Sequence, residues 1–145
     1  QYATGRHMTQ SFFSGAYSVE HVVEVVRNVF NGRVVFHQGD AEVAPGVTVH
    51  HIGGHTMGIQ CVRVKTKNGP VVLASDVSHF YENYESRSPF PIVYNVADMI
   101  HGFERLETLA GGHGIVVPGH DPLVLSRYPS VSPATKDIVV RIDGN

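Results

Sequence analysis

A series of short β-branched or aromatic runs, separated by turn residues, constrains the fold of this chain more than any other feature. The runs cover residues 33–37, 41–43, 47–52, 59–66 and 71–74. Runs of this length and composition are typical of β-strands. Asn68 and Gly69 stand between the last two runs, and this dipeptide favours a type I′ hairpin turn. The sequence therefore predicts an antiparallel meander.

Two other segments show helical periodicity. Apolar residues at helical spacing predict an amphipathic helix at about residues 19–31, which Ser18 can cap and Gly32 can end. A second apolar stripe begins after Asn95, a capping residue, and stops at Gly111. Residues 115–117 and 138–142 are expected to form two further strands. Two helices with a mostly antiparallel sheet place the chain in the α/β class, or α+β by some schemes.

Composition excludes several classes of protein. The chain has 145 residues, of which 42% are hydrophobic and 17% charged, and this is enough to bury one globular core. The formal net charge is -2 and the basic residues are dispersed, so neither nucleic acid nor an anionic membrane is an expected partner. Cys61 is the single cysteine, which excludes an internal disulfide. Because no signal pattern or membrane-length apolar stretch occurs, we expect a soluble, cytoplasmic protein.

Three loops each carry a metal-capable side chain just past an apolar run. They are His55 in a glycine-rich turn, Asp76 at the end of Leu-Ala-Ser-Asp, and His120 in the turn Pro-Gly-His-Asp. Imidazole nitrogen and carboxylate oxygen are ligands that suit zinc. Taken singly, each residue could equally be an ordinary loop or turn residue. The predicted hairpin brings the loops of His55 and Asp76 to one sheet edge, although 76 − 55 = 21 positions separate them.

These motifs resemble a known family. A Gly-His-Thr-x-Gly turn, a strand-end Ser-Asp and a Pro-Gly-His-Asp turn, in this order, are similar to those of the N-acyl homoserine lactonases of the metallo-β-lactamase superfamily. Residues 4–8, 45–47 and 89–91 also match the family pattern. The resemblance implies a metallo-β-lactamase-like αβ/βα sandwich. Since the family's His-x-His-x-Asp-His signature is absent from these residues, we expect residues 1–145 to be the C-terminal portion of such a domain.

The resemblance also implies roles for individual residues. Asp76 would bridge two zinc ions or similar divalent ions, His55 would complete one metal site and His120 the other, with the remaining ligands supplied by the absent signature. His79 and Tyr81 are candidate proton donors for the opening ring. Many relatives have a tyrosine three residues after the bridging aspartate, where this chain has His79. Asp121 is expected either to orient His120 or to serve as a simple turn residue.

Three functions are compatible with these features. The first is a metal-dependent hydrolase, in which a metal-bound hydroxide opens an N-acyl homoserine lactone or a related lactone. The second is a truncated, non-catalytic domain that acts by association with a partner chain. The third is another hydrolase of the superfamily, such as a thioesterase. Because this chain supplies only part of the site, we expect it to be inactive alone and to associate with a missing N-terminal half or with a second copy.

Overall fold

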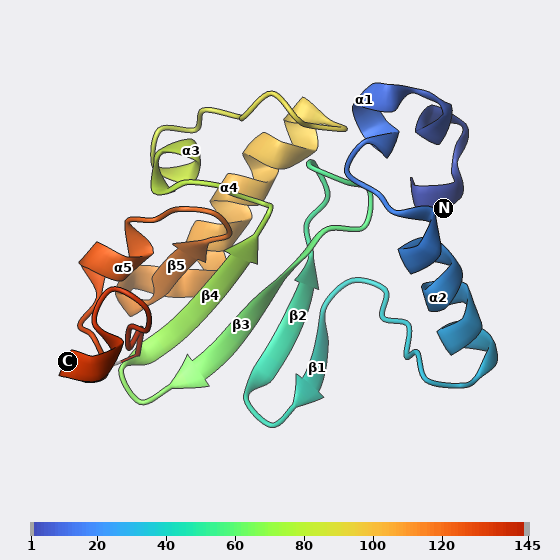
Figure 1. The fold of residues 1–145 in the computed structure, drawn as a ribbon. Helices are drawn as coiled ribbons and strands as arrows, with labels where there is room; N and C mark the ends of the chain where they lie inside the picture. The colour runs from blue at the N-terminus through green and yellow to red at the C-terminus, as the bar shows by residue number, and fades with distance from the viewer. Residues whose placement is uncertain (1, 144–145) are drawn as a thin grey trace. The chain divides into compact units, whose positions relative to one another are not determined.

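The computed structural model describes residues 2–143, which fall into two compact units divided between Gln38 and Gly39 (Figure 1). The first unit begins with short helical turns, η1 (Tyr2–Thr4), η2 (Arg6–Thr9) and α1 (Ser11–Ser14), followed by α2 (Val19–Phe30). The second unit holds the sheet, formed by β1 (Ala41–Ala44), β2 (Val47–His51), β3 (Gln60–Thr66), β4 (Gly69–Ser75) and β5 (Ile115–Pro118). Its helical elements are α3 (Tyr81–Glu85), α4 (Val96–Ala110), η3 (Gly111–His113), α5 (Val124–Arg127) and η4 (Pro133–Thr135).

The five strands form one mixed sheet in the order β1-β2-β3-β4-β5. The first four are antiparallel neighbours, as the sequence predicts, and β5 adds to β4 in the parallel direction. The strands predicted at residues 41–43, 47–52, 59–66, 71–74 and 115–117 are therefore confirmed, with ends that differ by one or two residues. A parallel neighbour needs a crossover, and α4 provides it between β4 and β5 (Figure 1).

The predicted hairpin between β3 and β4 is confirmed, but the prediction of a type I′ turn is wrong. Thr66 pairs with Gly69, so the central turn residues are Lys67 and Asn68. Neither has a positive φ, whereas a type I′ turn requires one at both positions. The Thr66 hydroxyl accepts from the Asn68 amide at 3.2 Å and stabilises the alternative turn. Gly69 is instead the first residue of the next strand and has φ +116. A Cβ at this position would lie 2.8 Å from the carbonyl oxygen of His113.

Helix α4 covers one face of the sheet (Figure 1) and contributes to both of its buried apolar clusters. It begins after Asn95, as the sequence predicts, and the Asn95 side chain caps it by accepting from the Asp98 amide at 3.2 Å. Its buried positions are Met99, Gly102, Phe103, Leu106 and Ala110. Leu106 and Ala110 pack with the fully buried strand residues Cys61 and Val72, whereas Met99 and Phe103 pack with Phe90. Each large apolar side chain buried in this way contributes about 1.5–3 kcal/mol, so this helix fixes the sheet and the loops at its edge.

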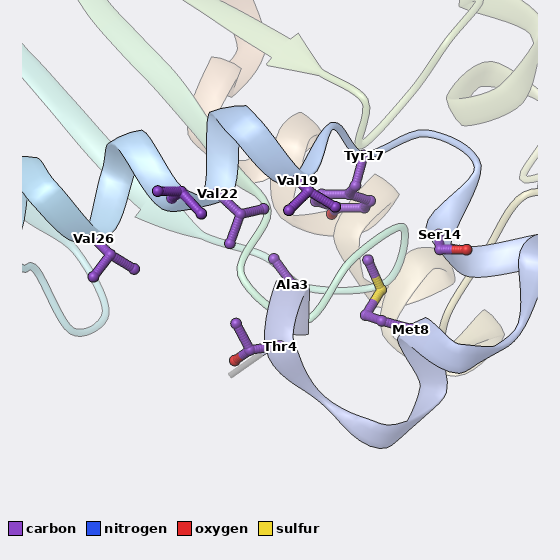
Figure 2. Close-up of a pocket in the computed structure, with 9 residues that line it drawn as sticks. Ala3, Thr4, Met8, Ser14, Tyr17, Val19, Val22 and Val26 are labelled. Atoms are coloured by element: carbon purple, nitrogen blue, oxygen red, sulfur yellow. The ribbon is translucent and has the colours of Figure 1, made fainter.

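The predicted helix at residues 19–31 is confirmed as α2, with Ser18 at its N-cap position and Gly32 after its last turn. The Ser18 side chain makes no capping hydrogen bond; its carbonyl accepts from the Val22 amide at 3.2 Å. No residue of α2 is buried. Its apolar face lines a pocket of about 430 Å³ against the chain's first turns (Figure 2). The pocket residues are Ala3, Thr4, Met8, Ser14, Tyr17, Val19, Val22, Val23 and Val26.

Two predicted strands do not form. Residues 33–37 have no strand structure, and Val35 and Phe36 are 77% and 76% exposed. Residues 138–142 make only one bridge, between Ser130 and Val140. Their β-branched composition suits strands, but a strand also needs a long hydrogen-bonded partner. Within residues 2–143, residues 33–37 join no ladder, and residues 138–142 pair only with the short segment at residues 129–131. In the same range, no helix is long and apolar enough to cross a membrane.

Candidate metal centre

Three loops meet at one edge of the sheet because of strand direction. β2 and β4 are both antiparallel to β3, and β5 is parallel to β4, so β2, β4 and β5 run the same way. The loops that follow these strands carry His55, Asp76 and His120, respectively. The sequence prediction that His55 and Asp76 share an edge is therefore confirmed, and the parallel strand brings His120 to them.

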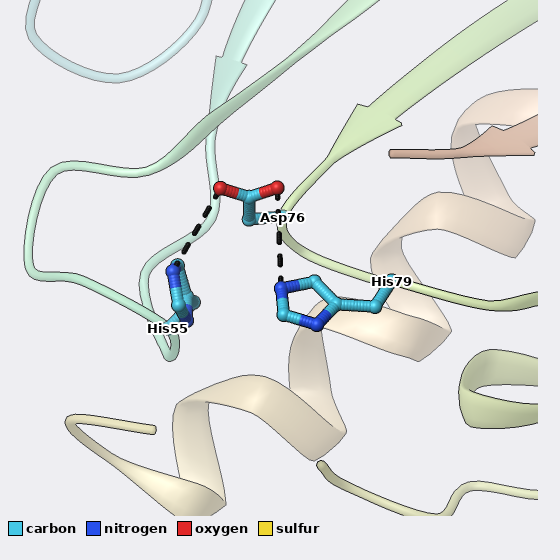
Figure 3. A group of neighbouring side chains, drawn as sticks. All are labelled: His55, Asp76 and His79. Carbon is cyan, nitrogen blue, oxygen red and sulfur yellow. Dashed lines mark ion pairs between the residues drawn. The ribbon is translucent and has the colours of Figure 1, made fainter. Parts of the chain in front are cut away.

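Asp76 stands at the centre of this group, with its side chain 34% exposed. Its Oδ1 accepts a hydrogen bond from His120 Nε2 at 2.7 Å. Its Oδ2 lies 3.8 Å from His55 Nε2, and its Oδ1 lies 4.0 Å from His79 Nε2. Figure 3 shows His55 and His79 facing the two oxygens of this carboxylate. Three imidazoles thus converge on one carboxylate.

The loop of His55 is held against the start of α4. Gly54 O accepts from the backbone amides of Tyr94 and Asn95, at 3.0 and 2.9 Å. Gly54 has φ +94, and a Cβ at this position would lie 2.7 Å from the Cα and N atoms of Met99. Only glycine combines that backbone conformation with so close an approach. Gly54 is therefore a packing requirement as well as part of a turn signal.

The ring of His55 has a defined orientation. Its Nδ1 lies 2.7 Å from Ile92 O. Because a carbonyl oxygen only accepts, Nδ1 must carry the proton and donate it, which leaves Nε2 as the nitrogen directed toward Asp76. The ring also contacts Phe90, with 5.4 Å between centroids. An imidazole held through one nitrogen by a carbonyl, with the other nitrogen free, is the arrangement of metal-ligating histidines.

Asp76 follows a strained backbone position. Ser75 has φ +50, in the left-handed region that residues other than glycine seldom adopt. The pairing of β4 with β5 also shifts register between Leu73 and Ser75. Irregularities of this kind turn a strand end and redirect the next side chain. Here they turn the chain just before Asp76.

The loops after β4 and β5 are joined by their backbones. The Gly119 amide donates to Ser78 O, and the His120 amide donates to His79 O, both at 2.9 Å. A Cβ on Gly119 would lie 2.7 Å from Ser75 O, so the two loops approach more closely than a side chain at residue 119 would allow. These contacts place His120 beside Asp76 although 44 positions separate the two residues.

His79 lies in the group as well. Its side chain is 19% exposed, and its ring stacks on Phe90 with 3.6 Å between centroids and 10° between planes. Burial lowers the pKa of His79; Asp76 opposes this shift, and the neighbouring His120 and His55 add to it. The ring is therefore held in place and favours its neutral form. A neutral imidazole offers a lone pair to a proton or to a metal ion.

Tyr81, the other candidate proton donor, lies elsewhere. It is 2% exposed, and its ring packs under the guanidinium of Arg127, 3.5 Å from the ring centroid. Burial, together with Tyr128, raises its pKa well above the usual range. The structure thus brings His55, Asp76, His79 and His120 together, and directs Tyr81 to a separate cluster with Arg127 and Tyr84.

Asp121 ties two loops together and does not orient His120. Its Oδ2 accepts from the Tyr81 amide and its Oδ1 from the Leu123 amide, each at 2.8 Å. The residue is 9% exposed. Of the two roles left open by the sequence, the turn role is the observed one. A buried carboxylate with two amide donors is a strong local constraint, because hydrogen bonds to a charged acceptor are stronger than neutral ones.

Replacing Asp121 by asparagine is expected to lower the free energy of unfolding by about 2 kcal/mol. Asparagine keeps one accepting oxygen, but its –NH2 group cannot accept, so one of the two backbone N–H donors loses its partner. Urea denaturation measures the change. Asp137→Asn is the matched control, because Asp137 is exposed and its φ of +62 suits asparagine. Equal stability of the two variants would contradict the prediction.

The donor set fits a divalent metal ion. Zinc binds nitrogen and oxygen at about 2.0–2.2 Å, so two ligands of one tetrahedral ion lie about 3.3–3.6 Å apart. His55, Asp76 and His79 each place one ligand atom so that all three lie within 4.8 Å of one another. Small side-chain rotations would close the difference. Sequence reasoning did not count His79 among the ligands, although its position three residues after Asp76 on the same loop is the signal that could have included it.

Curated relatives of this chain carry one name. An N-acyl homoserine lactonase from Bacillus sp. is 40% identical over 107 residues, which cover 72% of this chain and 42% of the relative. Another N-acyl homoserine lactonase, from Bacillus cereus, is 36% identical with the same coverage. The chain thus spans about two fifths of the length of these relatives. No protein-family model matches the chain.

Solved structures agree with the sequence matches. An N-acyl homoserine lactone hydrolase with the product N-hexanoyl-L-homoserine at its catalytic metal centre aligns with a TM-score of 0.54 and 32% identity, over 59% of this chain and 34% of that one. A quorum-quenching N-acyl homoserine lactone lactonase gives 0.54 and 33%, over 59% and 36%. AidC, a dizinc quorum-quenching lactonase, is only 13% identical over 78% of this chain and 40% of its own, at a TM-score of 0.54, and shows the fold alone. The predicted fold class and the resemblance are confirmed.

Proposed function

We propose that this chain, a relative of the N-acyl homoserine lactonases in sequence and in fold, is the C-terminal portion of a metal-dependent hydrolase that opens an N-acyl homoserine lactone or a related lactone. The meeting of His55, Asp76 and His120 at one sheet edge is the observation that carries the proposal. The proposal assigns the remaining ligands to the part of its relatives' length that this chain does not span. That part, or a second copy, would also cover exposed strand residues such as Leu73.

In the proposed site, Asp76 would be a ligand shared by two divalent ions, His55 would help to hold one ion and His120 the other, and zinc is the natural choice for these ligands. A bound divalent cation polarises a carbonyl oxygen and lowers the pKa of a water molecule. The chain's own contribution is to hold the ligands still. The carbonyl of Ile92 fixes the ring of His55, and the backbone of His79 fixes the loop of His120. Preorganised ligands of this kind favour the transition state, because no reorganisation is needed as charge develops.

Of the two candidate proton donors, only His79 lies beside Asp76. His79 lies beside Asp76, within reach of a substrate bound there. Tyr81 is buried under Arg127, and its backbone amide is bound to Asp121. We assign Tyr81 a supporting role, in which it holds the loop that carries His79. Of the two candidate proton donors, His79 is therefore the one placed at the proposed reacting centre.

The proposal is tested by removing the metal. The protein that carries this chain, expressed from the gene read upstream of the Gln1 codon, should open N-hexanoyl homoserine lactone. A chelator should abolish the activity, and added Zn²⁺ should restore it, because the proposed reaction depends on a bound divalent cation to polarise the carbonyl and to lower the pKa of water. Ring opening that survives complete metal removal would contradict the proposal.

Two further assay results would distinguish the lactonase from the two alternative functions. Hydrolysis of an acyl thioester but not of the lactone would identify another hydrolase of the same superfamily. Absence of both activities in a metal-loaded protein, with no His-x-His-x-Asp-His motif encoded upstream, would favour a non-catalytic domain that acts through a partner chain. The 145-residue chain alone is expected to show no ring opening, because it supplies only part of the two-metal site.

A further inference from the structure

The spacing around Asp76 distinguishes two kinds of contact. His120 Nε2 lies 2.7 Å from Asp76 Oδ1, which is a direct hydrogen bond with no room for an ion between the two atoms. His55 Nε2 and His79 Nε2 lie 3.8 and 4.0 Å from the carboxylate oxygens. These distances exceed the hydrogen-bond range and approach the separation of two ligands on one small cation. His55 and His79 therefore share a geometry that His120 does not.

The lone pairs at this site face one another. The Nδ1 atom of His55 donates to Ile92 O, so in the neutral ring Nε2 carries a lone pair directed at the Asp76 carboxylate. A cation placed between this nitrogen and the carboxylate oxygen, which lie 3.8 Å apart, would receive an electron pair from each of them. Figure 3 shows His79 approaching the same carboxylate from its other side. Together these atoms surround a space suited to a positive charge.

The ring of His79 is also held in a fixed position next to the carboxylate. Stacking on Phe90, which is 7% exposed, fixes the plane of the ring. The same phenylalanine contacts His55, with 5.4 Å between centroids, so one apolar side chain supports both imidazoles. Ligands that are already immobilised lose little conformational entropy when they bind an ion. Two imidazoles and one carboxylate form a donor set with the composition of catalytic zinc sites.

We propose that His79 is a metal ligand, so that His55, Asp76 and His79 form a three-donor site for one divalent cation within this chain. This inference rests on the proposed function and adds a ligand to it, at the position where many lactonases of this family carry a tyrosine. The sequence predicts only two ligands from this chain for each ion, whereas with His79 one ion receives three. In the chain with one ion, His120 orients Asp76 through its hydrogen bond.

Metal titration of the 145-residue chain tests the inference. Co²⁺ absorption gives the stoichiometry, and competition with a chelator gives the Zn²⁺ affinity. We expect one ion per chain. His79→Phe keeps the aromatic ring on Phe90 but removes both nitrogens, and we expect it to weaken binding about 100-fold or more, since loss of even an outer partner costs about 10–100-fold. His113→Phe is the matched control at an exposed histidine and should bind as the parent does.

Further variants distinguish a failure of the inference about His79 from a failure of the proposed function. His120→Phe should weaken Zn²⁺ binding less than His79→Phe does, and the reverse order would overturn the inference. If His79→Phe binds as tightly as the parent while Asp76→Asn does not, His79 is no ligand, but the proposed function survives. If Asp76→Asn and His55→Phe also bind as the parent does, the metal site and the proposed function both fail. Far-UV circular dichroism of each variant without metal shows whether a loss of affinity reflects a loss of fold.

Discussion

Asp76→Asn is expected to reduce kcat/KM for lactone opening by about 1000-fold or more in the metal-loaded protein, equivalent to about 4 kcal/mol of transition-state stabilisation. Asp76 is the only carboxylate among the side chains that converge at this edge in residues 2–143. Asparagine has a similar shape but no negative charge, so it holds a divalent cation weakly and cannot bridge two ions. The measurements are the rate of ring opening and the number of ions retained after dialysis.

The same substitution should change stability little, and this separates chemistry from folding. The Asp76 side chain is 34% exposed, and an amide oxygen can still accept from His120. Asp137→Asn provides the control for the chemical change itself at an exposed site. A variant of Asp76 that retained full activity and a full complement of metal would show that the centre lies elsewhere in the protein.

Gly54→Ala is expected to lower the free energy of unfolding by about 3–4 kcal/mol, a large effect for the addition of one methyl group. A Cβ at residue 54 would lie 2.7 Å from the backbone of Met99, and the φ of +94 is unfavourable for alanine. Helix α4 cannot retreat without disturbing the buried side chains of Met99 and Phe103. The strain would therefore displace the loop that carries His55, and metal affinity should fall together with stability.

Gly58→Ala is a stringent control because it lies in the same loop. A Cβ at residue 58 would meet nothing within 4 Å, and its φ lies outside the positive range. We expect its stability to match the parent within about 0.5 kcal/mol or to rise slightly, since alanine restricts the unfolded chain. Thermal and urea unfolding of both variants measure the difference. Equal stability of Gly54→Ala and Gly58→Ala would show that the contact with α4 is not tight.

Local signals account for the parts of the fold that the sequence predicts well. The helix that begins after Asn95 has a capping side chain, a continuous apolar stripe and a terminal glycine, and all three depend on neighbours within a few residues. The strands from residue 41 to residue 75 pair with their neighbours in chain order, through two short turns and the loop at residues 52–59. The strand predicted at residues 33–37 fails because pairing depends on a partner, which no local signal can supply.

In the candidate site, too, some features follow from the sequence and others depend on the tertiary structure. The sequence by itself determined which side chains could bind a metal and that His55, Asp76 and His120 follow apolar runs, because residue type and periodicity are local properties. Only the tertiary structure decided that His79 belongs with them and Tyr81 does not. That outcome depends on the stacking of His79 on Phe90 and on the packing of Tyr81 under Arg127, contacts between residues distant in the chain. Distances around one carboxylate are set by the packing of several loops, and periodicity carries no information about them.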